Sequence, residues 1–231
     1  MNIEESLLKA KILMQNLDAY LKTNHFIEIT DGVLRYIPDE IDKEKIVICF
    51  SGRNCDPKIT TEGMHLTATF ASMLGYNSFI SSAHDSSRRM TKSLVIQEIE
   101  KYGTNTKIFI FGHSHGADHA SIFAKELRQD FGIISEELHT IDPINSPWPF
   151  PLTRIADTGS IKKHINYYQR NFLFFGGNIK TATKSHNVSN YKEWPSLSKL
   201  LKTPSIKKPR ITHCTIDLDL LLGFDLIEGL I

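Results

Sequence analysis

The sequence predicts an α/β protein with a mostly parallel sheet and helices on both faces. Two observations lead to this fold class. Short apolar runs alternate along the chain with longer segments of helical periodicity, which is typical of βαβ crossovers. The strand-like runs are also apolar throughout, rather than alternating with polar residues, as expected for strands covered on both faces.

The bulk composition is that of an ordinary globular chain. Its 231 residues are 41% hydrophobic and 23% charged, with a net charge of +1, which suits a single domain spanning residues 1–231. The near-neutral balance predicts no nucleic-acid partner. The cysteines are few and scattered, so neither a disulfide framework nor a cysteine-rich zinc site is expected.

The N-terminal segment predicts a surface helix rather than a leader peptide. Glu4 and Glu5 stand where a signal peptide carries positive charge. The apolar positions of residues 1–24 follow helical spacing, which indicates an amphipathic helix. No apolar run approaches the length of a membrane span. We therefore expect a cytoplasmic protein without a transmembrane segment; export by a route that needs no signal would leave no trace in the sequence.

The expected elements follow one another in a regular order. Two β-rich runs on either side of Asp31-Gly32 predict a hairpin. Segments 143–163 and 176–212 are rich in loop residues. In parallel sheets, ligands bind beyond the carboxyl ends of the strands, so the chemistry is expected near 51–54, 82–86, 112–116 and 142–148. The further strands are expected at 45–50, 76–82, 107–112, 137–142 and 164–170, and the helices at 60–74, 87–102 and 115–130.

The stretch IFIFGHSHGADHA, residues 108–120, places a serine between two glycines. Gly112-His-Ser114-His-Gly116 fits G-x-S-x-G, in which the serine occupies a strained turn between a strand and a helix. Glycine is needed because side chains at 112 and 116 would collide there. The helix that follows carries a stripe of small residues, which lets it approach the sheet closely: Gly116, Ala117, Ala120, Ser121 and Ala124. Larger core contacts are expected from Phe123, Leu127 and Phe131.

The same stretch permits a second interpretation, a zinc site. His113, His115, Asp118 and His119 form H-x-H-x-x-D-H, one residue longer than the pattern of metallo-β-lactamase-like hydrolases. One residue turns a helical side chain by about 100°, and a zinc site would leave Ser114 unexplained. Without a metal, His113 would pack under the turn, and His115 and His119 would lie at the surface or a pocket rim. The serine hypothesis is favoured, and a zinc-dependent hydrolase is the alternative.

A serine nucleophile needs a base and an acid that orients the base, in the chain order Ser, Asp or Glu, His. Asp142 directly follows a predicted strand, whereas no strand leads into the alternative acid, Asp157. For the base, His213 lies in a loop that enters the final helical segment. His186 lies in a polar loop, and His164 opens a strand at the wrong end. His213 is favoured over His186.

The remaining parts of the site are backbone donors and aromatic side chains. An oxyanion hole is expected from the backbone N–H of His115 and a second N–H from Ser51 or Gly52. Trp148 and Phe150 are expected either to line an acyl pocket or to belong to the core.

These residues resemble the α/β-hydrolase superfamily, and its lipase-like branch in particular. FGHSHGA is similar to the family's strand, elbow and helix, TIDPI to its acid-bearing strand end, and THCTID to its late histidine loop. The resemblance covers roughly residues 45–217 and implies a three-layer α/β-hydrolase fold, with Ser114 as nucleophile, Asp142 as acid and His213 as base. It implies cleavage of a small-molecule or lipid carboxylic ester through an acyl-enzyme, with no cofactor and no metal. The non-enzyme alternative is a binding protein that keeps the fold and has lost the activity.

Overall fold

The computed structural model describes residues 26–30, 32–36, 42–52, 63–103, 105–144, 159–170 and 177–188. The helix expected at 1–24 lies outside them. The helices are α2 Gly63–Met73, α3 Asp85–Tyr102 and α4 His115–Phe131. The strands are β1 Phe26–Thr30, β2 Val33–Tyr36, β3 Asp42–Phe50, β4 Tyr76–Ser81, β5 Lys107–His113, β6 Ser135–Ile141, β7 Ile161–Tyr168 and β8 Lys184–Asn187.

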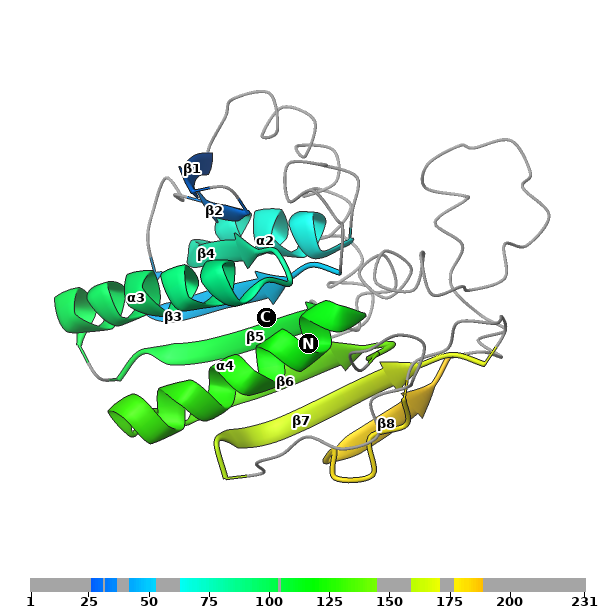
Figure 1. The fold of residues 1–231 in the computed structure, drawn as a ribbon. Coiled ribbons are helices and arrows are strands. Elements are labelled where there is room, and N and C mark those ends of the chain that lie inside the picture. Colours follow the sequence, from blue (N-terminus) through cyan, green and yellow to red (C-terminus); the bar gives the residue numbers. More distant parts are fainter. Residues whose placement is uncertain are drawn as a thin grey trace, which may run out of the picture.

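The strands form one mostly parallel sheet, as predicted. Their order is β1-β2-β4-β3-β5-β6-β7-β8 (Figure 1). The β1–β2 and β2–β4 pairs are antiparallel, and every pair from β4 to β8 is parallel. The carboxyl ends of β3 to β8 therefore meet at one edge of the sheet, where the sequence places the chemistry.

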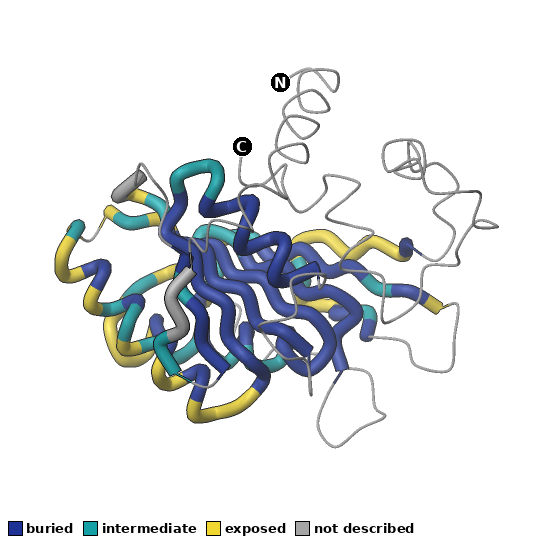
Figure 2. Tube along the Cα trace, turned by 90° about the horizontal axis from the view of Figure 1, so that it is seen from above, coloured by how far each residue is buried: buried dark blue, intermediate teal, exposed yellow. Residues whose placement is uncertain are grey.

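Helices cover both faces of the sheet, so the predicted three-layer architecture is confirmed. Residues of α2 pack with one set of strand side chains, including Val47, Phe111 and Tyr167. Residues of α3 and α4 pack on the opposite face, with Ile48 and Ile110 among others. Figure 2 shows the central strands buried, and the exposed residues lie mainly along α3, α4 and β8.

The small-residue stripe of α4 is buried against the sheet, as expected from the sequence. Phe123 and Leu127 are also fully buried. The expectation for Phe131 is wrong: its side chain is 48% exposed, because it is the last residue of α4 and the chain turns away at Gly132 in the left-handed region. Among the described helices, none is both long and apolar enough to span a membrane.

Two boundaries differ from the sequence prediction, both in segments expected to be loops. β7 begins at Ile161, inside the 143–163 segment, so His164 lies within the strand rather than at its start. β8 lies inside the 176–212 segment and was not predicted. All four of its residues are polar and exposed, and the strand is formed by backbone pairing with β7. A strand of this kind leaves no apolar pattern in the sequence.

We expect truncation of the two phenylalanines of α4 to separate core packing from surface exposure. Phe123→Ala should lower the free energy of unfolding by about 3–5 kcal/mol, because it empties a space next to the Phe50 ring, whose centroid lies 5.4 Å away. Phe131→Ala should change it by about 0.5 kcal/mol or less. Urea unfolding of the two variants measures the difference, and equal losses would contradict the assigned core.

Candidate active site

Ser114 occupies the sharp turn between β5 and α4. Its backbone angles are φ 57° and ψ −124°, in a region that residues with a side chain rarely adopt. The turn is enforced from both sides, because His113 ends the strand and His115 begins the helix. The geometry is the strained strand-to-helix turn that the sequence motif predicts.

The two flanking glycines are required by contacts with backbone atoms. A Cβ atom on Gly112 would lie 2.5 Å from the Gly116 carbonyl oxygen. A Cβ atom on Gly116 would lie 2.2 Å from the carbonyl oxygen of Phe50 and 2.4 Å from that of Ser51. Backbone atoms cannot move aside as the end of a flexible side chain can. The predicted crowding is therefore confirmed, and it involves three elements: β5, α4 and the end of β3.

Asp142 directly follows β6, and its backbone is also in the left-handed region, with φ 43°. Its side chain is completely buried. Two backbone hydrogen bonds join its turn to the serine turn: Ser114 N–H donates to the Ile141 carbonyl at 2.9 Å, and Ile144 N–H donates to the Ser114 carbonyl at 3.3 Å. The predicted nucleophile and acid thus lie on adjoining turns at one edge of the sheet.

Gln169 holds the Asp142 carboxylate, and sequence reasoning did not identify it. The backbone N–H of Gln169 donates to Oδ1 at 3.1 Å, and its Nε2 donates to Oδ2 at 2.9 Å. Gln169 is the residue after β7 and is fully buried. The available signal was its place at the carboxyl end of a predicted strand, which was not among the positions expected to carry chemistry.

The histidine candidates for the base are placed differently from one another. His213 lies outside the described residues, so its role stays a prediction. His186 lies in β8 rather than in a loop, and its ring stacks on Tyr167 with centroids 5.4 Å apart. His164 lies inside β7, and its Nε2 is 2.9 Å from Thr140 Oγ1. Burial, with a smaller effect from His139, lowers the pKa of His164 to about 4.

The expected oxyanion donors differ in availability. The backbone N–H of Ser51 donates to the Ser81 carbonyl at 2.9 Å, which continues the pairing of β3 with β4. Gly52, the next residue, is buried at the carboxyl end of β3. His115 is the first residue of α4 and is buried rather than at a rim. Trp148 and Phe150, the expected acyl-pocket residues, lie outside the described residues.

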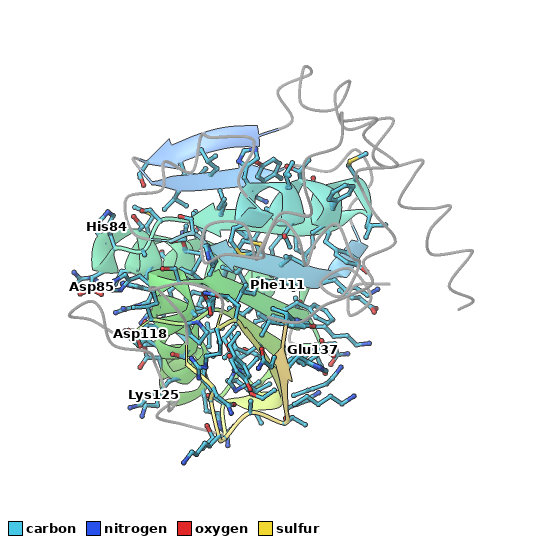
Figure 3. The ribbon with its side chains drawn as sticks, turned by 90° about the vertical axis from the view of Figure 1, so that its right-hand side faces the viewer. His84, Asp85, Phe111, Asp118, Lys125 and Glu137 are labelled. Carbon is cyan, nitrogen blue, oxygen red and sulfur yellow. The ribbon has the colours of Figure 1, made fainter. Side chains whose placement is uncertain are left out.

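The alternative zinc ligands do not form a metal site. Across the described segments, which include His113, His115, Asp118 and His119, no three side chains of metal-binding type converge. His119 instead faces α3, with its Nδ1 3.4 Å from Arg88 Nη1. Burial, followed by the charge of Arg88, lowers the pKa of His119 to about 4. Figure 3 shows that the labelled acidic side chains lie on different faces of the sheet: Asp85 and Asp118 on the face covered by α3 and α4, and Glu137 on the opposite face.

We expect Gly116→Ala to disrupt the turn that presents Ser114. The added methyl meets two carbonyl oxygens, so the free energy of unfolding should fall by about 1–3 kcal/mol or more as α4 is displaced from β3. Gly132→Asn is the control, because Gly132 has open space around its Cβ position and asparagine tolerates a positive φ. Thermal unfolding compares the two, and equal effects would contradict the assigned crowding.

We expect the protein to lose stability as the pH falls from about 6.5 to about 4. The unfolded chain binds protons on His164 and His119 in this range, whereas the folded chain does not. Stability is therefore complete above the ordinary histidine pKa and is lost on acidification. His164→Gln should flatten the dependence of the free energy of unfolding on pH. An unchanged slope in denaturant titrations would contradict the burial of a neutral His164.

Comparison with known proteins shows the fold. No family model matches the sequence, and no curated protein resembles it significantly. A protein of unknown function from Agrobacterium tumefaciens, a candidate α/β hydrolase, superposes with a TM-score of 0.51 at 10% identity, covering 87% of this chain and 98% of its own. An α/β serine hydrolase homologue from Coxiella burnetii gives 0.46 at 14% identity, covering 89% and 96%. A Pyrobaculum calidifontis esterase gives 0.44 at 12% identity, covering 74% and 75%. The chain has the α/β-hydrolase fold.

Proposed function

We propose that this protein is a serine hydrolase that cleaves carboxylic esters through an acyl-enzyme on Ser114, with Asp142 as acid and His213 as base. One observation carries the proposal. Among the described residues, Ser114 and Asp142 are the two non-glycine residues with positive φ. Strain of this kind costs about 1–3 kcal/mol per residue and concentrates at functional sites. The sequence motifs select the same two residues on independent grounds.

The proposed reaction has two halves. The His213 imidazole removes the Ser114 hydroxyl proton as Oγ attacks the ester carbonyl, and then gives that proton to the departing alcohol. A water molecule, deprotonated by the same imidazole, attacks the acyl-enzyme, releases the carboxylic acid and restores the serine. Asp142 holds the imidazole in the required orientation and stabilises its charged form.

Two backbone donors are proposed for the oxyanion. His115 N–H stands at the N-terminus of α4, where the helix dipole favours negative charge. Gly52 is the better second donor, since the Ser51 N–H is engaged by Ser81. The contact of Gly116 with the end of β3 brings these two segments together. The substrate class remains a small-molecule or lipid ester, with Trp148 and Phe150 proposed for its acyl side.

We expect a fluorophosphonate probe to label the wild-type protein on Ser114. Ser114→Ala should abolish labelling and lower kcat for a p-nitrophenyl ester by about 10⁴-fold to 10⁶-fold, because the substitution removes the nucleophile itself. Mass spectrometry of the labelled peptide identifies the site. Continued labelling of Ser114→Ala would remove this serine from the mechanism, and hydrolysis abolished by a chelator would favour the zinc alternative.

The same assay decides between the candidate bases. His213→Gln should lower labelling and hydrolysis as strongly as Ser114→Ala, whereas His186→Gln should leave both close to wild type. Asp142→Asn should lower kcat by about 10⁴-fold through loss of the imidazole's orientation. The opposite result for the two histidines would assign the base to His186.

A further inference from the structure

We infer that Gln169 is a positioning residue of the catalytic site: it fixes the orientation of the Asp142 carboxylate from the neighbouring strand. The inference rests on the proposed function, because it concerns the acid of the proposed triad. It assigns Gln169 no contact with the substrate.

Gln169 contacts both oxygens of the carboxylate by different groups. Its backbone N–H reaches Oδ1 and its side-chain amide reaches Oδ2, at 3.1 and 2.9 Å. The terminal torsion of an aspartate is broad, so one donor would leave the carboxylate plane free to turn. Two donors on separate oxygens define that plane. A carboxylate accepts about four hydrogen bonds, so these two donors are compatible with an imidazole N–H bound to the same group.

The end of β7 also holds the backbone of Asp142. The Asp142 N–H donates to the Tyr167 carbonyl at 2.7 Å. Asp142 therefore makes three hydrogen bonds with residues 167–169, one through its main chain and two through its side chain. They oppose relaxation of the positive φ, because any rotation about the Asp142 backbone would break them.

Burial makes these donors necessary. Asp142 and Gln169 are both completely buried, and a buried carboxylate must be compensated by hydrogen bonds or charge. The backbone donor would survive substitution of Gln169, whereas the amide donor is specific to the glutamine. Methionine has a similar length and no donor. Glutamate has nearly the same shape and places an oxygen where the amide nitrogen was.

We expect Gln169→Met to reduce kcat by about tenfold to a hundredfold, the usual effect of losing a hydrogen bond to a charged group, with KM nearly unchanged. Its acid limb in the pH profile of kcat/KM should move to lower pH. A well-oriented carboxylate favours the protonated imidazole, so a misaligned one lowers the pKa of the base. The rate of fluorophosphonate labelling should fall in parallel with kcat.

Gln169→Glu is a second variant that preserves the shape of the side chain. Two facing carboxyl groups share one proton until the pH exceeds a strongly raised pKa. With the shared proton, the introduced carboxyl group donates a hydrogen bond to Asp142 and activity is retained. Once that proton is lost, the two charges repel, so activity should fall at alkaline pH, in a limb that the wild type lacks.

Thr140→Val is the matched control. Thr140 lies on β6 two residues before Asp142, and its Oγ1 is 2.9 Å from both His164 Nε2 and Asn166 Oδ1. Its loss should lower the melting temperature and leave kcat per labelled site and the pH profile unchanged. A change in Thr140→Val equal to that in Gln169→Met would show a merely structural role and overturn the inference.

The outcomes also separate this inference from the proposed function. Labelling of the wild type but not of Ser114→Ala, with wild-type rates and pH limbs in both Gln169 variants, would overturn the inference alone. A wild-type protein that neither reacts with the probe nor hydrolyses esters would overturn the proposed function, and the role of Gln169 with it. The inference is supported if Gln169→Met has a lower kcat and a shifted acid limb while Thr140→Val keeps the wild-type kcat and pH profile.

Discussion

The close approach of three backbone segments at the start of α4 is the constraint on which the candidate site depends. Gly112 lets the end of β5 approach the first turn of α4, and Gly116 lets that turn touch the carbonyls of Phe50 and Ser51. No room is left for a relaxed connection, so Ser114 takes a positive φ. The same approach places the N-terminus of α4 beside the residues after β3. The positions proposed for the nucleophile and the oxyanion donors thus follow from one steric condition.

The strain at the serine turn is balanced by hydrogen bonds to the next turn along the sheet. Ser114 N–H donates to the Ile141 carbonyl, and Ile144 N–H donates to the Ser114 carbonyl. The position of Asp142 therefore depends on that of Ser114. Asp142 is held in turn by the residue that follows β7. In the register of β6 on β7, Ile141 pairs with Tyr167. This register sets the position of Asp142, and the hydrogen bonds between the two turns then set the position of Ser114. Ser114, Asp142 and Gln169 thus follow three adjacent strands, β5, β6 and β7, and hydrogen bonds connect each of these strand ends to the next.

The sequence predicted an element where burial of that element requires a recognisable pattern of apolar residues or glycines. The strand at Lys107–His113 is apolar because both of its faces are covered. The glycines around Ser114 form a recognisable local motif, although Gly116 is required by contacts with Phe50 and Ser51, which lie far away in the sequence. β8 is an exposed, entirely polar strand paired with β7. A strand of this kind has no apolar pattern, so neither it nor the position of His186 could be predicted. The role of Gln169 arises from a contact between residues 27 positions apart. Such a contact depends on sheet register, which no local pattern specifies.

The histidine-rich stretch shows how neighbours decide the chemistry of identical residue types. The side chains that follow the serine on α4 are of types that can coordinate a metal ion: His115, Asp118 and His119. The structure instead sets α3 against this part of α4. Arg88 of α3 forms an ion pair with Glu126 of α4 at 3.0 Å and another with Asp85 of its own helix at 2.8 Å. Its guanidinium also lies beside the His119 ring. A dication beside that guanidinium would be repelled. The first turn of α4 thus presents the serine, and its later polar residues anchor the neighbouring helix that covers the sheet.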